Sequence, residues 1–345
     1  QNGTLPNMIR GSDAGNRDTS DAPLWFITAC SDLVKKEGTD RFLSESCGER
    51  TVREVLLSIG NALTRGLPNG VRMDPATALI FSPAHFSWMD TNHPAGSPRQ
   101  GYPIEIQALW HAALSFLSHI ENKEKWRKLT SQVRASIKNL FYLPEKGYLS
   151  DCRHCLPGES ALQAVADDAL RPNQLFALTL EALTDKKIGE GVLSACASLL
   201  VPGAIRSLAD RAVHPPLPIW HHNQLLNDPD FPYTGQYKGD EDTHRKPAYH
   251  NGTAWTWPFP SFCEAWIKIY GKGAKRTARA WLSSTLDIVR AGCIGQIPEI
   301  LDGDAPHHPR GCDAQAWGVS EWVRVFLLAG TKKEKEVHQH RYRRH

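Results

Sequence analysis

The most regular pattern along the chain is an apolar residue every three or four positions, which is the spacing of one helical face. In the segment "TVREVLLSIGNALTRG" that face is made by Val52, Val55, Leu56, Ile59 and Leu63. The same spacing recurs in residues 106–120, 172–183, 186–201, 246–271, 274–292 and 312–330. Strand-like alternation is nearly absent, with short extended pieces expected around 77–82 and 147–151. The pattern therefore predicts an all-α protein, either a toroid of helix pairs or a helical solenoid.

The composition and charge of the chain narrow the kinds of protein and partner that we expect. The chain has 345 residues, of which 41% are hydrophobic and 22% are charged, as in an ordinary soluble globular protein. No apolar run is long enough to predict a membrane span. The net charge is +3, and the basic segment 331–345 is expected to be a solvated, disordered tail. We find no folded basic face and expect no nucleic-acid partner.

The first residues of the chain and its cysteine content indicate the cellular compartment in which we expect the protein. The chain begins at Gln1 and shows no signal-peptide pattern, so we expect a processed chain or a fragment in the cytoplasm. Eight scattered cysteines are too few for a disulfide scaffold and favour a reducing compartment. The Cys152-x-x-Cys155 pair is interpreted as loop thiols, with a metal or redox pair as the alternative. We expect no metal and no cofactor, although Asp302 and Asp304 leave a calcium loop as a weaker alternative.

Four long loops carry the candidate chemistry: residues 87–110, 156–177, 232–258 and 292–317. They combine aromatic rings with carboxylates, amides and arginines. This combination of residue types favours sugar binding, because a pyranose face stacks on an aromatic ring and its hydroxyl groups form hydrogen bonds to carboxylates and amides. Among the 11 tryptophans, Trp88 and Trp255 lie in polar loops and are expected to contact sugar. Three others at helical spacing are expected in the core: Trp266, Trp281 and Trp322.

Glycoside hydrolysis needs two carboxyl groups, one protonated and one ionised. Asp90 follows Trp88 and Met89, an apolar neighbourhood that suits a proton donor. Glu299 stands between Pro298 and an apolar pair in a loop far along the chain. From the residues alone, this pair is one choice among several.

Six blocks in collinear order resemble the amylo-α-1,6-glucosidase domain of glycogen debranching enzymes. They are "NGTLPN", "TSDAPLWF", "RQGYPIEIQALW", "RPNQLFA", "YHNGTAWTW" and "GQIPEILDGDAPHHPRGCDAQAW". The resemblance covers roughly residues 1–330 and implies a single (α/α)6 toroidal catalytic domain of the six-hairpin glycosidase type. It also implies hydrolysis of α-1,6-linked glucose at a branch of glycogen or another α-glucan, with inversion.

The resemblance assigns roles residue by residue. Asp90 of "WMDT" matches the general acid, and Glu299 of "PEI" matches the general base. Further motif positions are expected to contact sugar or to support the residues that do: Asp21, Trp25, Arg99, Glu105, Asn173, Gln174, His250, Trp255 and Gln315.

Two departures from the family pattern leave alternatives open. The first helices of the toroid, with a Trp-Gly-Arg-Asp segment, have no counterpart here, and neither does the large N-terminal domain of many relatives. We therefore expect a catalytic domain that is incomplete at its N-terminus. The alternatives are an (α/α)6 glycosidase acting on another α-glycoside, and an inactive carbohydrate-binding remnant.

Overall fold

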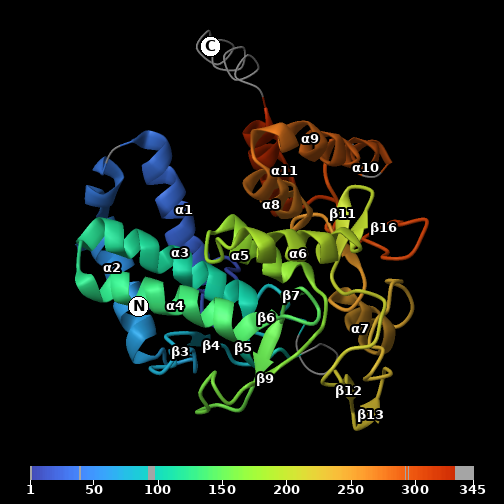
Figure 1. The fold of residues 1–345 in the computed structure, drawn as a ribbon, viewed down its shortest axis with the longest axis horizontal. Helices are drawn as coiled ribbons and strands as arrows, with labels where there is room; N and C mark the ends of the chain where they lie inside the picture. The colour runs from blue at the N-terminus through green and yellow to red at the C-terminus, as the bar shows by residue number, and fades with distance from the viewer. Residues whose placement is uncertain (1, 39, 92–97, 292, 294, 331–345) are drawn as a thin grey trace. The chain divides into compact units, whose positions relative to one another are not determined.

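The computed structural model describes residues 2–38, 40–91, 98–291, 293 and 295–330. They form two compact units, each considered by itself (Figure 1). Unit 1 comprises Gln1–Asp168 and Leu180–Thr184, and unit 2 comprises Ala169–Thr179 and Asp185–His345. The expected tail, 331–345, and the middle of the 87–110 loop, 92–97, lie outside the described residues. A single catalytic domain over 1–330 remains a prediction.

Unit 1 is built on four helices: α1 (Ala22–Glu37), α2 (Val52–Arg65), α3 (Ile104–Glu121) and α4 (Glu124–Phe141). A 3₁₀ turn, Arg41–Ser44, follows α1. The strands are short: β1 (Ser46–Cys47), β2 (Arg50–Thr51), β3 (Arg72–Met73), β4 (Ile80–Phe81), β5 (Gly101–Pro103), β6 (Tyr142–Leu143), β7 (Tyr148–Leu149), β8 (Cys152–His154) and β9 (Val165–Ala166).

Helix α3 is the centre of unit 1, and α1, α2 and α4 pack against it. Its residues are buried on almost every side, including Trp110, whose indole N–H donates to the carbonyl of Ala78 at 3.0 Å. The amide of Gln107 accepts from the N–H of Ile80 at 2.7 Å and donates to its carbonyl at 2.9 Å. A buried amide whose hydrogen bonds are all formed holds its partners in one arrangement. Gln107 therefore fixes the position of β4, the strand that leads into the Asp90 segment.

Unit 2 contains the remaining helices: α5 (Leu175–Thr179), α6 (Lys186–Ala197), α7 (Lys246–Tyr249), α8 (Phe259–Tyr270), α9 (Lys275–Ser283), α10 (Thr285–Ala291) and α11 (Ala316–Ala329). Two 3₁₀ turns, Pro172–Gln174 and Lys272–Ala274, and a π-helical turn, Glu241–Arg245, join them. Its strands are β10 (Leu200–Val201), β11 (Ala204–Arg206), β12 (Trp220–His221), β13 (Gln224–Leu225), β14 (Ala254–Trp255), β15 (Ile300–Leu301) and β16 (Pro309–Arg310).

Helix α8 organises unit 2, since α5, α6, α9 and α11 all pack on it. The tryptophans expected in the core lie between these helices but are only partly buried. Trp266 and Trp281 meet edge to face at 4.9 Å between ring centroids, and the indole of Trp322 donates to Leu282 at 2.9 Å.

The helical prediction holds for the class of fold, but α1 and α4 were not predicted, and three details differ. The 246–271 segment divides into α7, β14 and α8, and the 274–292 segment divides into α9 and α10. A five-stranded antiparallel sheet, in the order β10-β11-β14-β15-β16, was not expected. Strands of two or three residues are too short to show alternation, so this sheet leaves no signal in the sequence.

Gly101 lies where the backbones of β5 and β8 approach each other closely, and substituting it tests this approach. Its φ is +129°, and a Cβ there would lie 2.1 Å from the carbonyl oxygen of Arg153. We expect Gly101→Ala to lower the free energy of unfolding by more than about 2 kcal/mol, because backbone on both sides must shift. Chemical denaturation followed by circular dichroism measures this.

The matched control is Gly147→Ala, where φ is +78° and no atom lies within 4 Å of the added Cβ. It should cost only about 1 kcal/mol of backbone strain. Equal losses in the two variants would contradict the steric argument.

Candidate active site

The segment carrying Asp90 leaves β4 and runs over the surface of unit 1. Trp88 and Met89 are buried, with 7% and 2% of their surface exposed, whereas Asp90 is exposed. The N–H of Met89 donates to the hydroxyl of Ser87 at 3.3 Å. The two residues before Asp90 are therefore anchored, and the carboxyl group projects from a fixed base.

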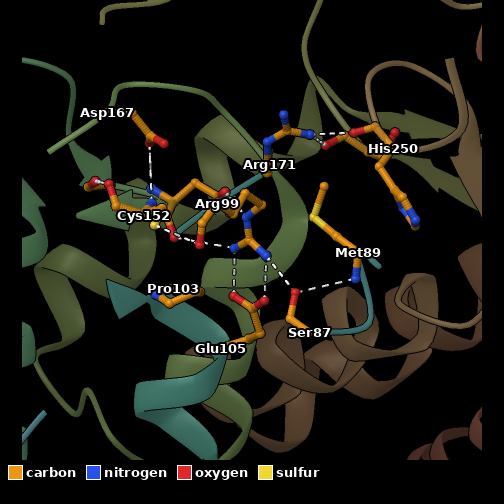
Figure 2. A network of polar contacts seen from close by, with 12 residues as sticks. Ser87, Met89, Arg99, Pro103, Glu105, Cys152, Asp167, Arg171 and His250 are labelled. Atoms are coloured by element: carbon orange, nitrogen blue, oxygen red, sulfur yellow. Dashed lines mark hydrogen bonds and ion pairs between the residues drawn. The ribbon is translucent and has the colours of Figure 1, made fainter. Parts of the chain in front are cut away.

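Arg99 holds this segment from inside unit 1. Its guanidinium forms two parallel bonds to Glu105, at 2.6 and 2.7 Å, and its Nε donates to Asp151 at 2.7 Å. It also donates to the hydroxyl of Ser87 at 3.1 Å, which links the ion pairs to the Asp90 segment (Figure 2). Arg99 and Glu105, predicted as contacts or supports, thus form a buried brace.

The Asp21 segment is tied to the same place. The hydroxyls of Ser20 and Ser82 are 2.8 Å apart, and the N–H of Ser20 donates to the carbonyl of Phe86 at 2.6 Å. Burial raises the pKa of Asp21 to about 6, and the negative charges of Glu105 and Asp90 act in the same direction. A bond from Thr19 to the Asp21 carboxyl group, at 2.6 Å, opposes them.

Trp25 lies in the first turn of α1, the helix that begins directly after Asp21. Its backbone N–H donates to the carbonyl of Asp21 at 2.8 Å, and its side chain is partly buried. In unit 1, hydrogen bonds and electrostatic interactions therefore link four predicted site residues, Asp21, Asp90, Arg99 and Glu105, while Trp25 and Trp88 stand close to them in sequence.

Glu299 lies in unit 2, at the start of β15, and is 7% exposed. One carboxylate oxygen accepts from the side-chain amide of Gln315, and the other accepts from the N–H of Cys312 at 3.1 Å. Its own N–H donates to the carbonyl of Cys312 at 2.9 Å. Gln315, predicted from the same motif, is thus in direct contact with Glu299.

Gly311 is a position that sequence reasoning missed. Its φ is +68°, and a Cβ there would lie 2.2 Å from Oε2 of Glu299. Only glycine leaves room for the carboxylate in this conformation. The "RGC" turn that follows β16 was the available signal.

The sheet brings Trp255 beside Glu299, because Trp255 on β14 pairs with Ile300 on β15. The indole of Trp255 stacks on the ring of His250, with centroids 5.0 Å apart and planes 8° apart. Trp317, at the start of α11, meets Trp255 edge to face at 6.1 Å. An aromatic cluster therefore adjoins the Glu299 segment.

Arg171 is a second position that sequence reasoning missed. Its buried guanidinium donates to the carbonyl of His250, as Figure 2 shows, and to the side-chain oxygen of Asn251 at 2.8 Å. Asn173 and Gln174 follow in the 3₁₀ turn, and both are almost fully buried. The "RPNQ" motif therefore packs inside unit 2, where Arg171 fixes the loop that carries His250.

The sequence leaves cysteines and carboxylates as alternative metal ligands or redox groups. Within the described ranges, no group of three or more His, Cys, Asp or Glu side chains could hold a metal ion. All eight cysteines are free thiols. Asp302 accepts from Arg310 at 2.9 Å, and Asp304 accepts from the hydroxyl of Tyr233 at 2.8 Å.

Arg99→Lys tests the brace. Lysine keeps the charge but cannot form the two parallel bonds to Glu105 while also donating to Asp151. We expect the free energy of unfolding to fall by about 3 kcal/mol, because two buried carboxylates lose their partner. Urea denaturation at neutral pH measures this, and the exposed Arg50→Lys is the control, which should change stability by less than about 0.5 kcal/mol. Equal losses in the free energy of unfolding of the two variants would contradict a stabilising role for the Arg99 ion pairs.

Asp21→Asn tests the raised pKa. Asp21 binds a proton more tightly in the folded chain than in the unfolded chain, where the pKa is about 3.9. The parent should therefore lose stability relative to the variant as pH rises from about 4 through 6, by an amount on the order of 2 kcal/mol. Denaturation curves across this range measure the difference. The control is Asp18→Asn, which removes an exposed carboxyl group nearby, and a matching profile would contradict the assignment.

Comparisons with known proteins give one family match and include two structural likenesses. A family model described as amylo-alpha-1,6-glucosidase matches residues 1–324. Comparison with curated protein sequences gives no match. A solved structure of a rhamnosidase from Klebsiella oxytoca with rhamnose bound is similar at a TM-score of 0.52 and 11% identity, covering 95% of this chain and 51% of that one. Neutral trehalase Nth1 from Saccharomyces cerevisiae gives a TM-score of 0.45 and 10% identity, covering 68% of this chain and 39% of that one.

The chain thus spans about half the length of the rhamnosidase structure and less of the trehalase. At this identity the rhamnosidase likeness shows the fold alone, and it confirms the predicted (α/α)6 fold class. None of the described helices is both long and apolar enough to cross a bilayer. The match over residues 1–324 shows that the chain belongs to the amylo-alpha-1,6-glucosidase family of glycoside hydrolases.

Proposed function

We propose that this protein hydrolyses α-1,6-linked glucose at the branch points of glycogen or a related α-glucan, with inversion at the anomeric carbon. The observation that carries the proposal is the family match over residues 1–324. The reaction needs a carboxyl group that donates a proton and a carboxylate that activates water. We assign these roles to Asp90 and Glu299.

The setting of Asp90 supports the role of proton donor. Its carboxyl group follows two buried apolar residues and interacts electrostatically with Asp21. Neighbouring carboxyl groups resist ionising together, so this cluster favours keeping a proton among its members. The Arg99–Ser87 bond, at 3.1 Å, gives the segment the rigidity that directed proton transfer requires.

The setting of Glu299 supports the role of base. Each of its oxygens accepts a hydrogen bond from an N–H group, one from Gln315 and one from Cys312. These donors hold the carboxyl group in place, and each oxygen retains a further lone pair that can accept from water. Gln315 thereby becomes a positioning residue for Glu299.

The remaining predicted residues divide into supports and sugar contacts. Arg99 and Glu105 support Asp90 through their ion pair, and we propose no direct sugar contact for them. The other predicted residues remain the proposed sugar contacts or their immediate neighbours: Asp21, Trp25, Trp88, Asn173, Gln174, His250 and Trp255.

The test is glucose release from a singly branched dextrin by the parent and by Asp90→Asn and Glu299→Gln. We expect each variant to lower the turnover number by about 10³-fold, because each loses one half of the acid–base pair. NMR during the first turnovers should show β-glucose from the α-linked substrate. Asp313→Asn, which alters an exposed carboxylate beside Cys312, is the control and should retain activity.

Different failures point to different alternatives. Cleavage of another α-linked disaccharide, with none of the branched dextrin, would identify another α-glycosidase. Binding of maltodextrin without turnover would identify an inactive carbohydrate-binding chain. Unchanged glucose release by both variants would refute the assignment of Asp90 and Glu299.

A further inference from the structure

One stretch of unit 2 contains no Asp, Glu, Lys or Arg. It comprises residues 212–227, "AVHPPLPIWHHNQLLN", whereas 22% of the whole chain is charged. The stretch ends in the hairpin of β12 and β13 and contains none of the predicted site residues. Figure 1 shows this hairpin at an end of unit 2 well separated from β11 and β16, the strands of the sheet that contains Trp255.

The hairpin exposes large apolar side chains. Trp220 is 52% exposed and Leu225 is 39% exposed, and Phe231, shortly after the hairpin, is 57% exposed. Trp220 and Leu225 are directly opposite each other across the two strands. Cross-strand partners project from the same face, so the indole and the leucine form one apolar surface.

The hairpin is held rigidly. Its two turn residues, His222 and Asn223, have φ angles of 45° and 63°, as in the tight turns that match the twist of a hairpin. At its base, the Asn227 side chain accepts from the N–H of Ile219 at 2.8 Å and donates to the carbonyl of Leu217 at 2.9 Å. Leu217 joins a buried cluster below the hairpin. A ring on such a support is presented without a large ordering cost.

The polar groups of the hairpin are neutral donors and acceptors. His221 and Gln224 are cross-strand partners on the face opposite to Trp220 and Leu225, and the turn adds His222 and Asn223. Imidazoles and amides can both donate to and accept from hydroxyl groups. A nucleic acid or an anionic membrane would require Lys and Arg, which this stretch lacks.

We propose that the β12–β13 hairpin is a second carbohydrate-binding surface, in which Trp220 stacks on the outer glucose units of a neutral α-glucan chain. The identity of the polymer rests on the proposed function. A surface of this kind holds a branched polymer near the catalytic residues and raises the effective concentration of its branch points. It has no such effect on an oligosaccharide too short to reach both places.

The test compares the parent with Trp220→Ala and Trp220→Tyr by affinity electrophoresis in gels containing glycogen. We expect alanine to weaken retention about tenfold and tyrosine to keep most of it, because tyrosine retains a stacking ring. KM for glycogen should rise in the alanine variant, while kcat and the KM for a small branched oligosaccharide stay unchanged. Tyr270→Ala is the matched control, since it removes an exposed aromatic ring of unit 2 outside the hairpin.

Retention of Trp220→Ala equal to that of the parent, or no retention of the parent on glycogen, would overturn the inference. A shift from dimer to monomer in sedimentation, with retention unchanged, would also overturn it and identify a contact between copies. Weakened retention of Trp220→Ala in a protein that releases no glucose would support the surface while refuting the proposed debranching activity.

Discussion

The burial of Arg99 is the constraint on which the organisation of unit 1 depends. Its side chain is 3% exposed, and those of Glu105 and Asp151 are 1% and 2% exposed, so all three charges have left water. Such a cluster is stable only when every charge has a partner, which fixes the start of α3 and the strand region of Asp151 relative to each other. One cation facing two carboxylates leaves an excess of negative charge. Burial is the main cause of the raised pKa of Asp21 nearby, and the negative charge of Glu105 adds to it.

Unit 2 positions its carboxylate by another route. Glu299 is placed by the register of β14 and β15 and by the turn at Gly311, which allows the N–H of Cys312 to reach the carboxylate. Here a backbone N–H and the neutral side-chain amide of Gln315, rather than a second charge, satisfy the buried group. The helices supply a scaffold in both units, while the residues with candidate chemistry lie in the connecting segments.

The sequence predicted the helices that bury one continuous face, and α2 is the clearest case, with Leu56, Ile59 and Leu63 all buried. It did not single out α1. It also missed α4, because much of that helix is charged and its buried residues are widely spaced. The sugar-binding character of the loops was also recognisable from residue types, but Asp90 and Glu299 were one choice among several until the family resemblance singled them out, and Gln315 came from the resemblance alone. The support given by Arg171 and Gly311 was not recognisable, because it depends on contacts between distant segments: the guanidinium of Arg171 meets a carbonyl about eighty residues away.

The two carboxyl environments differ in a way that bears on the proposed mechanism. An acid–base pair works when its members hold opposite protonation states at the same pH, and environments that push two carboxyl groups apart achieve this. Asp90 interacts with another carboxyl group, Asp21, whereas Glu299 is surrounded by N–H donors. Hydrogen bonds from Gln315 and Cys312 hold the Glu299 carboxylate in one orientation, whereas Asp90 is exposed and follows two buried residues. The two groups are therefore positioned by different kinds of contact, and exchanging their proposed roles would ask the constrained group to follow the leaving oxygen and the exposed one to orient water.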